Sequence, residues 1–155
     1  MLRNLMIGAI SAAALTFSTG AFAQQGGTAQ EARGMLDKAV AAVKADQVVA
    51  IAMFLKGEGG FLDRDLYPFC FRIADAKGLA GPKAVPAGTD VRTLKDANGN
   101  AYGQAIYAAA QKPEGEITVV GPYLFPKPGT TTPTFPKVSF VTKVGELGCG
   151  VGYYN

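Results

Sequence analysis

Two cysteines constrain how this chain folds, because they are the only cysteines among its 155 residues. Cys70 lies in the segment LYPFCF, and Cys149 lies in the C-terminal segment GELGCGVGYYN. In an oxidising compartment two such cysteines pair more often than they stay free, and two cysteines allow only one pairing. Both segments have the composition of β-strands, so a Cys70–Cys149 disulfide requires the first and last strands to be neighbours. A redox-active pair is the alternative, but the Cys-x-x-Cys spacing is missing.

The N-terminus has the form of an export signal. Arg3 precedes the apolar run LMIGAISAAALTF, and Ala21 and Ala23 are small residues of the kind that signal peptidase accepts. A retained membrane anchor is disfavoured because the run is shorter than the about 20 residues that span a bilayer. We therefore predict that residues 1–23 are a signal peptide and that the mature protein begins at Gln24 and is periplasmic or secreted.

Composition excludes several classes of function. The chain has no histidine, which excludes a histidine triad and histidine-ligated haem or zinc, and two cysteines alone do not complete a zinc site. The formal net charge of +3 is too small and too scattered to indicate nucleic-acid binding. No nucleophile and base pair is recognisable, so we expect no catalysis, no metal and no cofactor.

Periodicity predicts a single α+β domain in residues 24–155. Residues 29–56 are alanine-rich with apolar residues at helical spacing, which predicts one long helix that ends at Gly57. The tight turn Gly145-Glu146 joins the last two predicted strands. Strands are predicted at residues 66–74 with Pro68 at the start, near residue 79, and at residues 116–123, 137–144 and 148–154, with a helical turn at 91–94 and a helix at 102–111.

Several motifs, in order, resemble the single Cache domain family of extracytoplasmic sensor modules. The motifs are LYPFCF, GTDVRTLKDANGNAYGQAIYAAA, YLFPKPG, PKVSFVTKV and GCGVGYY, and the resemblance covers residues 29–155. It implies a PAS-like fold, in which a long N-terminal helix packs behind a central antiparallel sheet. Members of this family form periplasmic parts of chemoreceptors and histidine kinases, and bind small ligands, often short carboxylates, between the sheet and the crossing loops.

The chain departs from the family at three points. Gly81 stands where many relatives have a ligand-facing histidine, and Phe140 stands where many have a tyrosine three residues after a lysine. That lysine is kept, as Lys137. The chain also stops after the domain, so a stand-alone module is expected.

Lys137 is the residue that we predict to meet a ligand carboxylate, with aromatic residues excluding water from the pair. A solvated strand lysine is the alternative, because most lysines are exposed. Hydroxyl donors and further cations are weaker candidates. The predicted ligand-binding residues are Lys137, Tyr123, Phe69, Phe71, Phe125, Tyr67, Tyr102, Lys83 and Arg72.

Two acidic segments are interpreted as loops. DANGN resembles a calcium loop but lacks the downstream acidic residue of an EF-hand, so a turn at Asn98-Gly99 is favoured. Asp63 and Asp65 flank Arg64 in LDRD, which indicates a solvated loop.

Together these observations predict a non-catalytic periplasmic binding or sensor module for a small organic anion, with a membrane-bound chemoreceptor or sensor kinase as the possible partner. The alternative is a structural or interaction module with a vestigial pocket, which the replaced histidine and tyrosine positions favour. Monomer and dimer both stay open.

Overall fold

The computed structural model describes residues 26–155. The predicted signal peptide, residues 1–23, and the predicted new N-terminus at Gln24 lie outside this range. Within the described range, no helix combines the length and the apolar character that crossing a membrane requires. The elements in chain order are α1 (Ala29–Ala45), α2 (Gln47–Lys56), β1 (Pro68–Arg72), β2 (Gly78–Ala80), the 3₁₀ helix η1 (Val91–Thr93), α3 (Tyr102–Ala109), β3 (Ile117–Phe125), β4 (Phe135–Val144) and β5 (Leu147–Tyr154).

The N-terminal helical segment is two helices, so the prediction of one long helix is wrong. Asp46 separates them in an extended conformation, with φ −159° and ψ 104°. Its side chain accepts a hydrogen bond from the backbone N–H of Val49 and so caps α2. Aspartate is a strong N-cap because it satisfies one of the free N–H groups of a first helical turn. The predicted end at Gly57 is confirmed, in the left-handed conformation with φ 67°.

The strands form one antiparallel sheet in the order β2-β1-β5-β4-β3. The first and last long strands, β1 and β5, are therefore neighbours inside the sheet. Cys70 lies directly opposite Cys149 in their register, with a Cα–Cα distance of 4.2 Å, and the two form a disulfide. The predicted disulfide and the predicted α+β architecture are confirmed.

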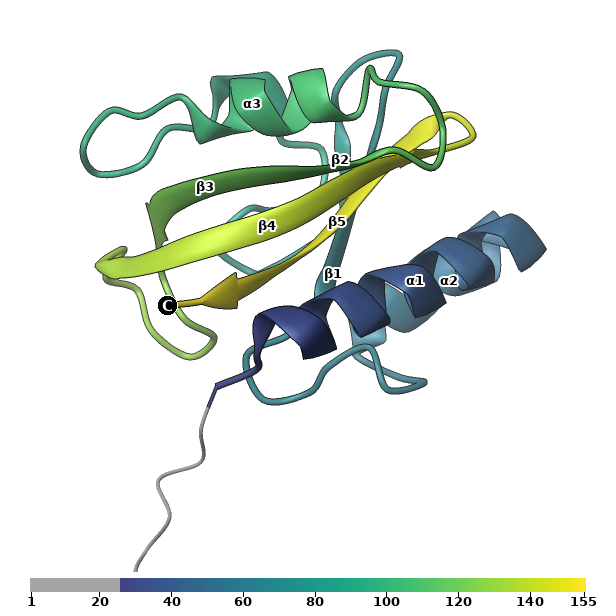
Figure 1. The fold of residues 1–155 in the computed structure, drawn as a ribbon, viewed down its shortest axis with the longest axis horizontal. Coiled ribbons are helices and arrows are strands. Elements are labelled where there is room, and N and C mark those ends of the chain that lie inside the picture. The colour runs from purple at the N-terminus through teal and green to yellow at the C-terminus, as the bar shows by residue number, and fades with distance from the viewer. Residues whose placement is uncertain (1–25) are drawn as a thin grey trace, which may run out of the picture.

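Helices cover both faces of the sheet, as Figure 1 shows. Helices α1 and α2 lie on one face, which we call the helix face, and α3 lies on the other, the pocket face. Each face has its own hydrophobic core. The helix-face core includes Leu36, Val43, Phe54, Leu147, Cys149 and Val151. The pocket-face core includes Phe71, Val91, Ile106, Tyr123, Phe125 and Val141.

Strand β5 presents larger side chains to the helix face and glycines to the pocket face, because small and large residues alternate along it. Gly148, Gly150 and Gly152 face the pocket side, where a Cβ atom on any of them would overlap a neighbouring side chain. On Gly150 the overlap would be with the ring of Phe69, and on Gly152 with the stem of Lys137. The glycines therefore leave room for side chains from the neighbouring strands to lie across β5, and that room positions the site described next.

Candidate functional site

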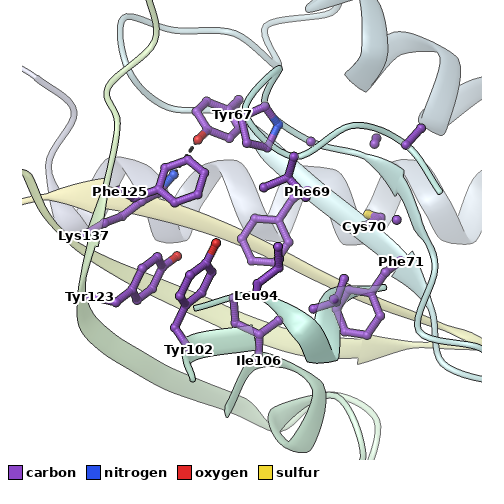
Figure 2. Close-up of a pocket in the computed structure, with 17 residues that line it drawn as sticks. Tyr67, Phe69, Cys70, Phe71, Leu94, Tyr102, Ile106, Tyr123, Phe125 and Lys137 are labelled. Carbon is purple, nitrogen blue, oxygen red and sulfur yellow. Dashed lines mark hydrogen bonds between the residues drawn. The ribbon is translucent and has the colours of Figure 1, made fainter. Parts of the chain in front are cut away.

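A small pocket lies on the pocket face, between the sheet, α3 and the loop that follows β2. Its volume is about 50 Å³, which is the space of a few water molecules. Figure 2 shows its lining, which is mostly aromatic and aliphatic. The lining residues are Tyr67, Phe69, Cys70, Phe71, Gly78, Ala80, Gly81, Pro82, Val85, Ala87, Val91, Leu94, Tyr102, Ile106, Tyr123, Phe125 and Lys137.

Strand register brings the polar end of this pocket together. Lys137 on β4 lies opposite Tyr123 of β3 on one side and opposite Tyr154 of β5 on the other. Tyr67 comes from the segment just before β1, and Phe125 ends β3. Residues far apart in the sequence thus surround one amine.

Lys137 is buried, with 2% of its surface exposed. Its Nζ donates a hydrogen bond of 2.6 Å to the hydroxyl of Tyr67. The same ammonium lies over three aromatic rings, at 4.2 Å from the centre of Tyr67, 4.8 Å from Phe125 and 5.0 Å from Tyr154. Throughout residues 26–155, no carboxylate forms an ion pair with it. A buried cation without an anionic partner is costly, since burial disfavours the charged form.

Burial lowers the pKa of Lys137 from 10.5 to about 7, and the negative charge of Asp65 partly opposes this lowering. An anion placed beside the amine would favour the charged form and raise this pKa again. The pocket can therefore take up a carboxylate and a proton together near neutral pH.

Tyrosine hydroxyls provide the other polar groups of the pocket. Tyr102 and Tyr123 stack with their ring centres 4.3 Å apart, and their hydroxyls point toward the side of the pocket where the Lys137 amine lies (Figure 2). The Tyr123 hydroxyl is 2.7 Å from Ser139 Oγ, whereas the Tyr102 hydroxyl makes no such bond with the described residues. Burial raises the pKa of Tyr102 to about 12, so its hydroxyl stays protonated and can donate to an anion.

The DANGN turn anchors the crossing segment that covers the pocket. The Asp96 carboxylate accepts hydrogen bonds from the backbone N–H of Asn98, of Asn100 and of Leu124 on β3. These bonds lower the pKa of Asp96, the contact with Leu124 contributing most. The carboxylate is therefore used in fixing the turn against the sheet, in agreement with the interpretation of DANGN as a turn.

The structure brings seven of the predicted ligand-binding residues to the pocket and places two elsewhere. The seven are Lys137, Tyr123, Phe69, Phe71, Phe125, Tyr67 and Tyr102. Arg72, at the end of β1, is half-exposed and its Nη2 lies 2.7 Å from Asp75 Oδ2, so its charge is paired outside the pocket. Lys83 lines a separate groove on the surface.

Phe140 does not face the pocket. It packs on the helix face, against Tyr153 with ring centres 5.8 Å apart. A hydroxyl at position 140 would therefore not reach Lys137, which removes one argument for a vestigial site.

Two residues near Lys137 were not predicted from the sequence as part of the site. Asp65 was expected in a solvated loop, but it is 8% exposed and accepts a hydrogen bond of 2.6 Å from the N–H of Gly27. That expectation is wrong because the N-terminal segment covers this loop. Tyr154 could have been found from the sequence, since counting outward from the tight turn Gly145-Glu146 pairs it with Lys137.

Comparison with known proteins identifies a family whose model matches this chain. The family model described as single Cache domain 2 matches residues 71–154. Among curated proteins, no match is found.

Three solved structures share the fold at low sequence identity. A methyl-accepting chemotaxis protein from Vibrio parahaemolyticus RIMD 2210633 is 21% identical with a TM-score of 0.61, over 81% of this chain and 86% of that chain. A structure described as the basis for carboxylic acid recognition by a Cache chemosensory domain is 23% identical with a TM-score of 0.56, over 81% and 86% of the two chains. A periplasmic sensor domain of a chemotaxis protein is 22% identical with a TM-score of 0.53, over 81% and 88%.

Proposed function

Because this chain belongs to the single Cache domain 2 family, we propose that it is a non-catalytic periplasmic sensor module that binds a small organic carboxylate beside Lys137. Cache domains are ligand-sensing, and one similar structure is described as recognising carboxylic acid. The ligand class is thus suggested by the comparison, and its place in this chain by the chemistry of the pocket.

The observation that carries the proposal is the buried Lys137 ammonium without an acidic partner in the described chain. A bound carboxylate would supply the missing negative charge in a site from which water is excluded, where a charge-assisted hydrogen bond is strong. The Tyr102 hydroxyl can donate to the second carboxylate oxygen. The aliphatic lining leaves room for a short apolar tail only.

A thermal-shift screen tests the proposal. Acetate, propionate and butyrate are the probes, with the corresponding amides as neutral controls. A ligand that binds only the folded state stabilises it by about 2.7 kcal/mol at a hundredfold excess over Kd. Stabilisation by at least one acid and by none of the amides is the expected result, and no response to any acid would contradict the proposal.

The variant Lys137→Met tests whether Lys137 binds the carboxylate. Methionine keeps the apolar stem and removes the charge, so the acid found in the screen should bind about 2 to 5 kcal/mol more weakly by calorimetry. Lys95→Met is the matched control, because Lys95 is exposed and lines neither the pocket nor the groove. Unchanged affinity in Lys137→Met would move the carboxylate site elsewhere.

A second candidate is an interaction module whose pocket is not used. It is supported by the lack of a side chain at Gly81, where the family resemblance implies a ligand-facing histidine in many members, and by the small volume of the cavity. The same screen separates the two candidates. In either case we propose a membrane-bound chemoreceptor or sensor kinase as the partner.

The periplasmic location rests on cleavage of residues 1–23. N-terminal sequencing of the protein from the periplasmic fraction should begin at Gln24. Recovery of the intact N-terminus at Met1 would contradict it.

A further inference from the structure

A second hollow, which we call the outer groove, adjoins the Lys137 pocket at the surface. Its volume is about 440 Å³, within the range of about 300 to 1,000 Å³ that is usual for small-molecule sites. It lies between the end of α2, the loop after β2 and the loop after β3. The residues that line it are Phe54, Leu55, Lys56, Gly57, Phe61, Leu62, Tyr67, Gly81, Pro82, Lys83, Ala84, Pro126, Lys127, Pro128, Gly129 and Thr130.

The outer groove and the pocket share a wall. Tyr67, Gly81 and Pro82 line both of them. Gly81 has no side chain, and a Cβ atom there would meet only the Cβ of Phe69, at 3.5 Å. At Gly81 the shared wall therefore consists of backbone alone.

The outer groove is positively charged and partly apolar. Lys56, Lys83 and Lys127 line it, and no acidic residue does. In the described part of the chain, none of these lysines takes part in an ion pair. Leu55 and Leu62 also line it and are exposed at 58% and 55%. An occupant with an apolar chain and a negative charge would match both properties.

Tyr154 connects the two charged sites. The ammonium of Lys137 lies 5.0 Å from the centre of its ring, and the ammonium of Lys127 lies 5.4 Å from the same centre. One of these lysines lines the pocket and the other lines the outer groove. A single flexible ligand can therefore contact both.

The sizes of the two hollows make an extended ligand reasonable. The pocket alone, at about 50 Å³, has room for little more than a carboxylate and a short chain. The greater part of the available volume lies in the outer groove, which Lys56, Lys83 and Lys127 line.

We propose that the ligand of this chain is an acid with two carboxylates joined by an apolar chain, an α,ω-dicarboxylate. One carboxylate binds Lys137, the chain passes beside Gly81, and the second carboxylate binds Lys83 or Lys127 at the rim of the outer groove. This inference rests on the proposed function, since it needs Lys137 as the site of the first carboxylate. It adds Gly81, Lys83 and Lys127 as residues that determine the length and charge of the ligand.

Calorimetry with paired acids tests the proposal. Glutarate, adipate and pimelate are compared with pentanoate, hexanoate and heptanoate, so that each pair has the same chain length. At least one diacid should bind about two- to fivefold more tightly than its monoacid partner, which is the gain expected from one solvent-exposed ion pair. The double variant Lys83→Met/Lys127→Met should remove this difference by weakening the diacids more than their monoacid partners, and Lys95→Met should not remove it.

A substitution at Gly81 tests the path of the chain. Gly81→Leu places a side chain on the shared wall and should weaken the long acids about tenfold or more, while acetate binding changes less than about twofold. Gly34→Leu is the matched control, because a Cβ at Gly34 meets no atom within 4 Å. If Gly81→Leu does not fold, the double variant Lys83→Met/Lys127→Met alone tests the inference, because its two residues lie at the surface.

Two outcomes overturn the inference and are distinguishable. Equal affinity of every diacid and its monoacid partner, with binding still lost in Lys137→Met, would overturn the inference and leave the proposed function standing. If neither the mono- nor the diacids bind the wild-type protein, the proposed function fails and the inference fails with it.

Discussion

On β5, Leu147, Cys149 and Val151 pack in the helix-face core, whereas Gly148 and Gly152 face the pocket side. The same strand therefore has large side chains on the helix face and glycines, without side chains, on the pocket face. The helix face is filled by residues of β5 itself and is crosslinked by the disulfide. The pocket face is filled by long side chains from β1 and β4 that lie across the glycines.

This difference indicates where stability and binding are located. The helix face holds a core of buried hydrophobic residues, which contributes to folding through burial of apolar surface. The pocket face holds a buried amine and several tyrosine hydroxyls. Such groups lower stability unless they are hydrogen-bonded or, for a charge, paired. Variants of the helix face should therefore change stability alone, and variants of the pocket face should change binding as well.

The largest effect is expected from removing the disulfide. The double variant Cys70→Ala/Cys149→Ala should lower the free energy of unfolding by about 2 to 5 kcal/mol, because the crosslink restricts the unfolded chain over a separation of 79 residues. Denaturant unfolding measures this change. Two titratable thiols in the oxidised wild-type protein would contradict the premise.

Lys137→Met should act in the opposite direction and raise stability at neutral and acidic pH. The folded-state pKa is about 7, below the unfolded value of 10.5, so below pH 7 the amine is charged in both states and the whole cost of burying it is present. Between pH 7 and 10.5 only the unfolded chain holds the proton, so wild-type stability rises with pH over this window. The gain in Lys137→Met should thus be about 2 to 4 kcal/mol at pH 6 and should vanish by about pH 10.5.

Difference curves of unfolding free energy against pH, wild type minus variant, measure this effect without interference from other titrating groups. A difference that does not depend on pH would contradict the buried, charged state of Lys137. The same pKa predicts that carboxylate affinity decreases about tenfold per pH unit above pH 7, until the pKa of the bound form is reached.

Gly152→Ala probes the bare side of β5. Its new Cβ would overlap the stem of Lys137 and lie 2.5 Å from Ser139 Oγ, so we expect a loss of about 1 to 3 kcal/mol in stability together with weaker binding of the acid. Gly34→Ala, in α1, is the control and should stabilise by about 0.4 to 1 kcal/mol without changing affinity. Calorimetry and thermal melts on both variants compare the two effects. Unchanged binding in Gly152→Ala would show that Lys137 can shift freely.

The smallest effect is expected at the start of α1 on the helix face. Thr28 and Glu31 form a capping box, in which each side chain bonds the backbone N–H of the other residue. Thr28→Ala should lower stability by about 1 kcal/mol and leave ligand affinity within error. A change in affinity similar to that in Gly152→Ala would weaken the functional separation of the two faces.

Much of the fold could be predicted because its signals are local or unique. The two cysteines allow one pairing, the tight turn Gly145-Glu146 sets the register of the last hairpin, and Gly57 ends the second helix. The prediction of a single long helix was wrong, because the alanine-rich sequence on both sides of Asp46 favours an uninterrupted helix. There the capping preference of one residue prevails over the helix propensity of its neighbours.

The site was harder to predict than the fold. Phe69 and Phe71, predicted as aromatic residues of the site, line the pocket, whereas Arg72, predicted as a further cation, is paired with Asp75 outside it. Asp65 was missed because its burial depends on a contact with Gly27, which is 38 residues away in sequence. The roles of all these residues in binding stay predictions.

The sequence by itself determined that the first and last strands are neighbours and that the last two strands form a hairpin, because the two cysteines allow one pairing and the tight turn sets the register. Only the tertiary structure decided that Lys137 is buried and lacks an acidic partner in the described chain, and that the outer groove adjoins its pocket. Burial is a property of everything that packs over a residue. Around Lys137 those groups come from Tyr67, Phe125 and Tyr154, which meet only when the sheet closes.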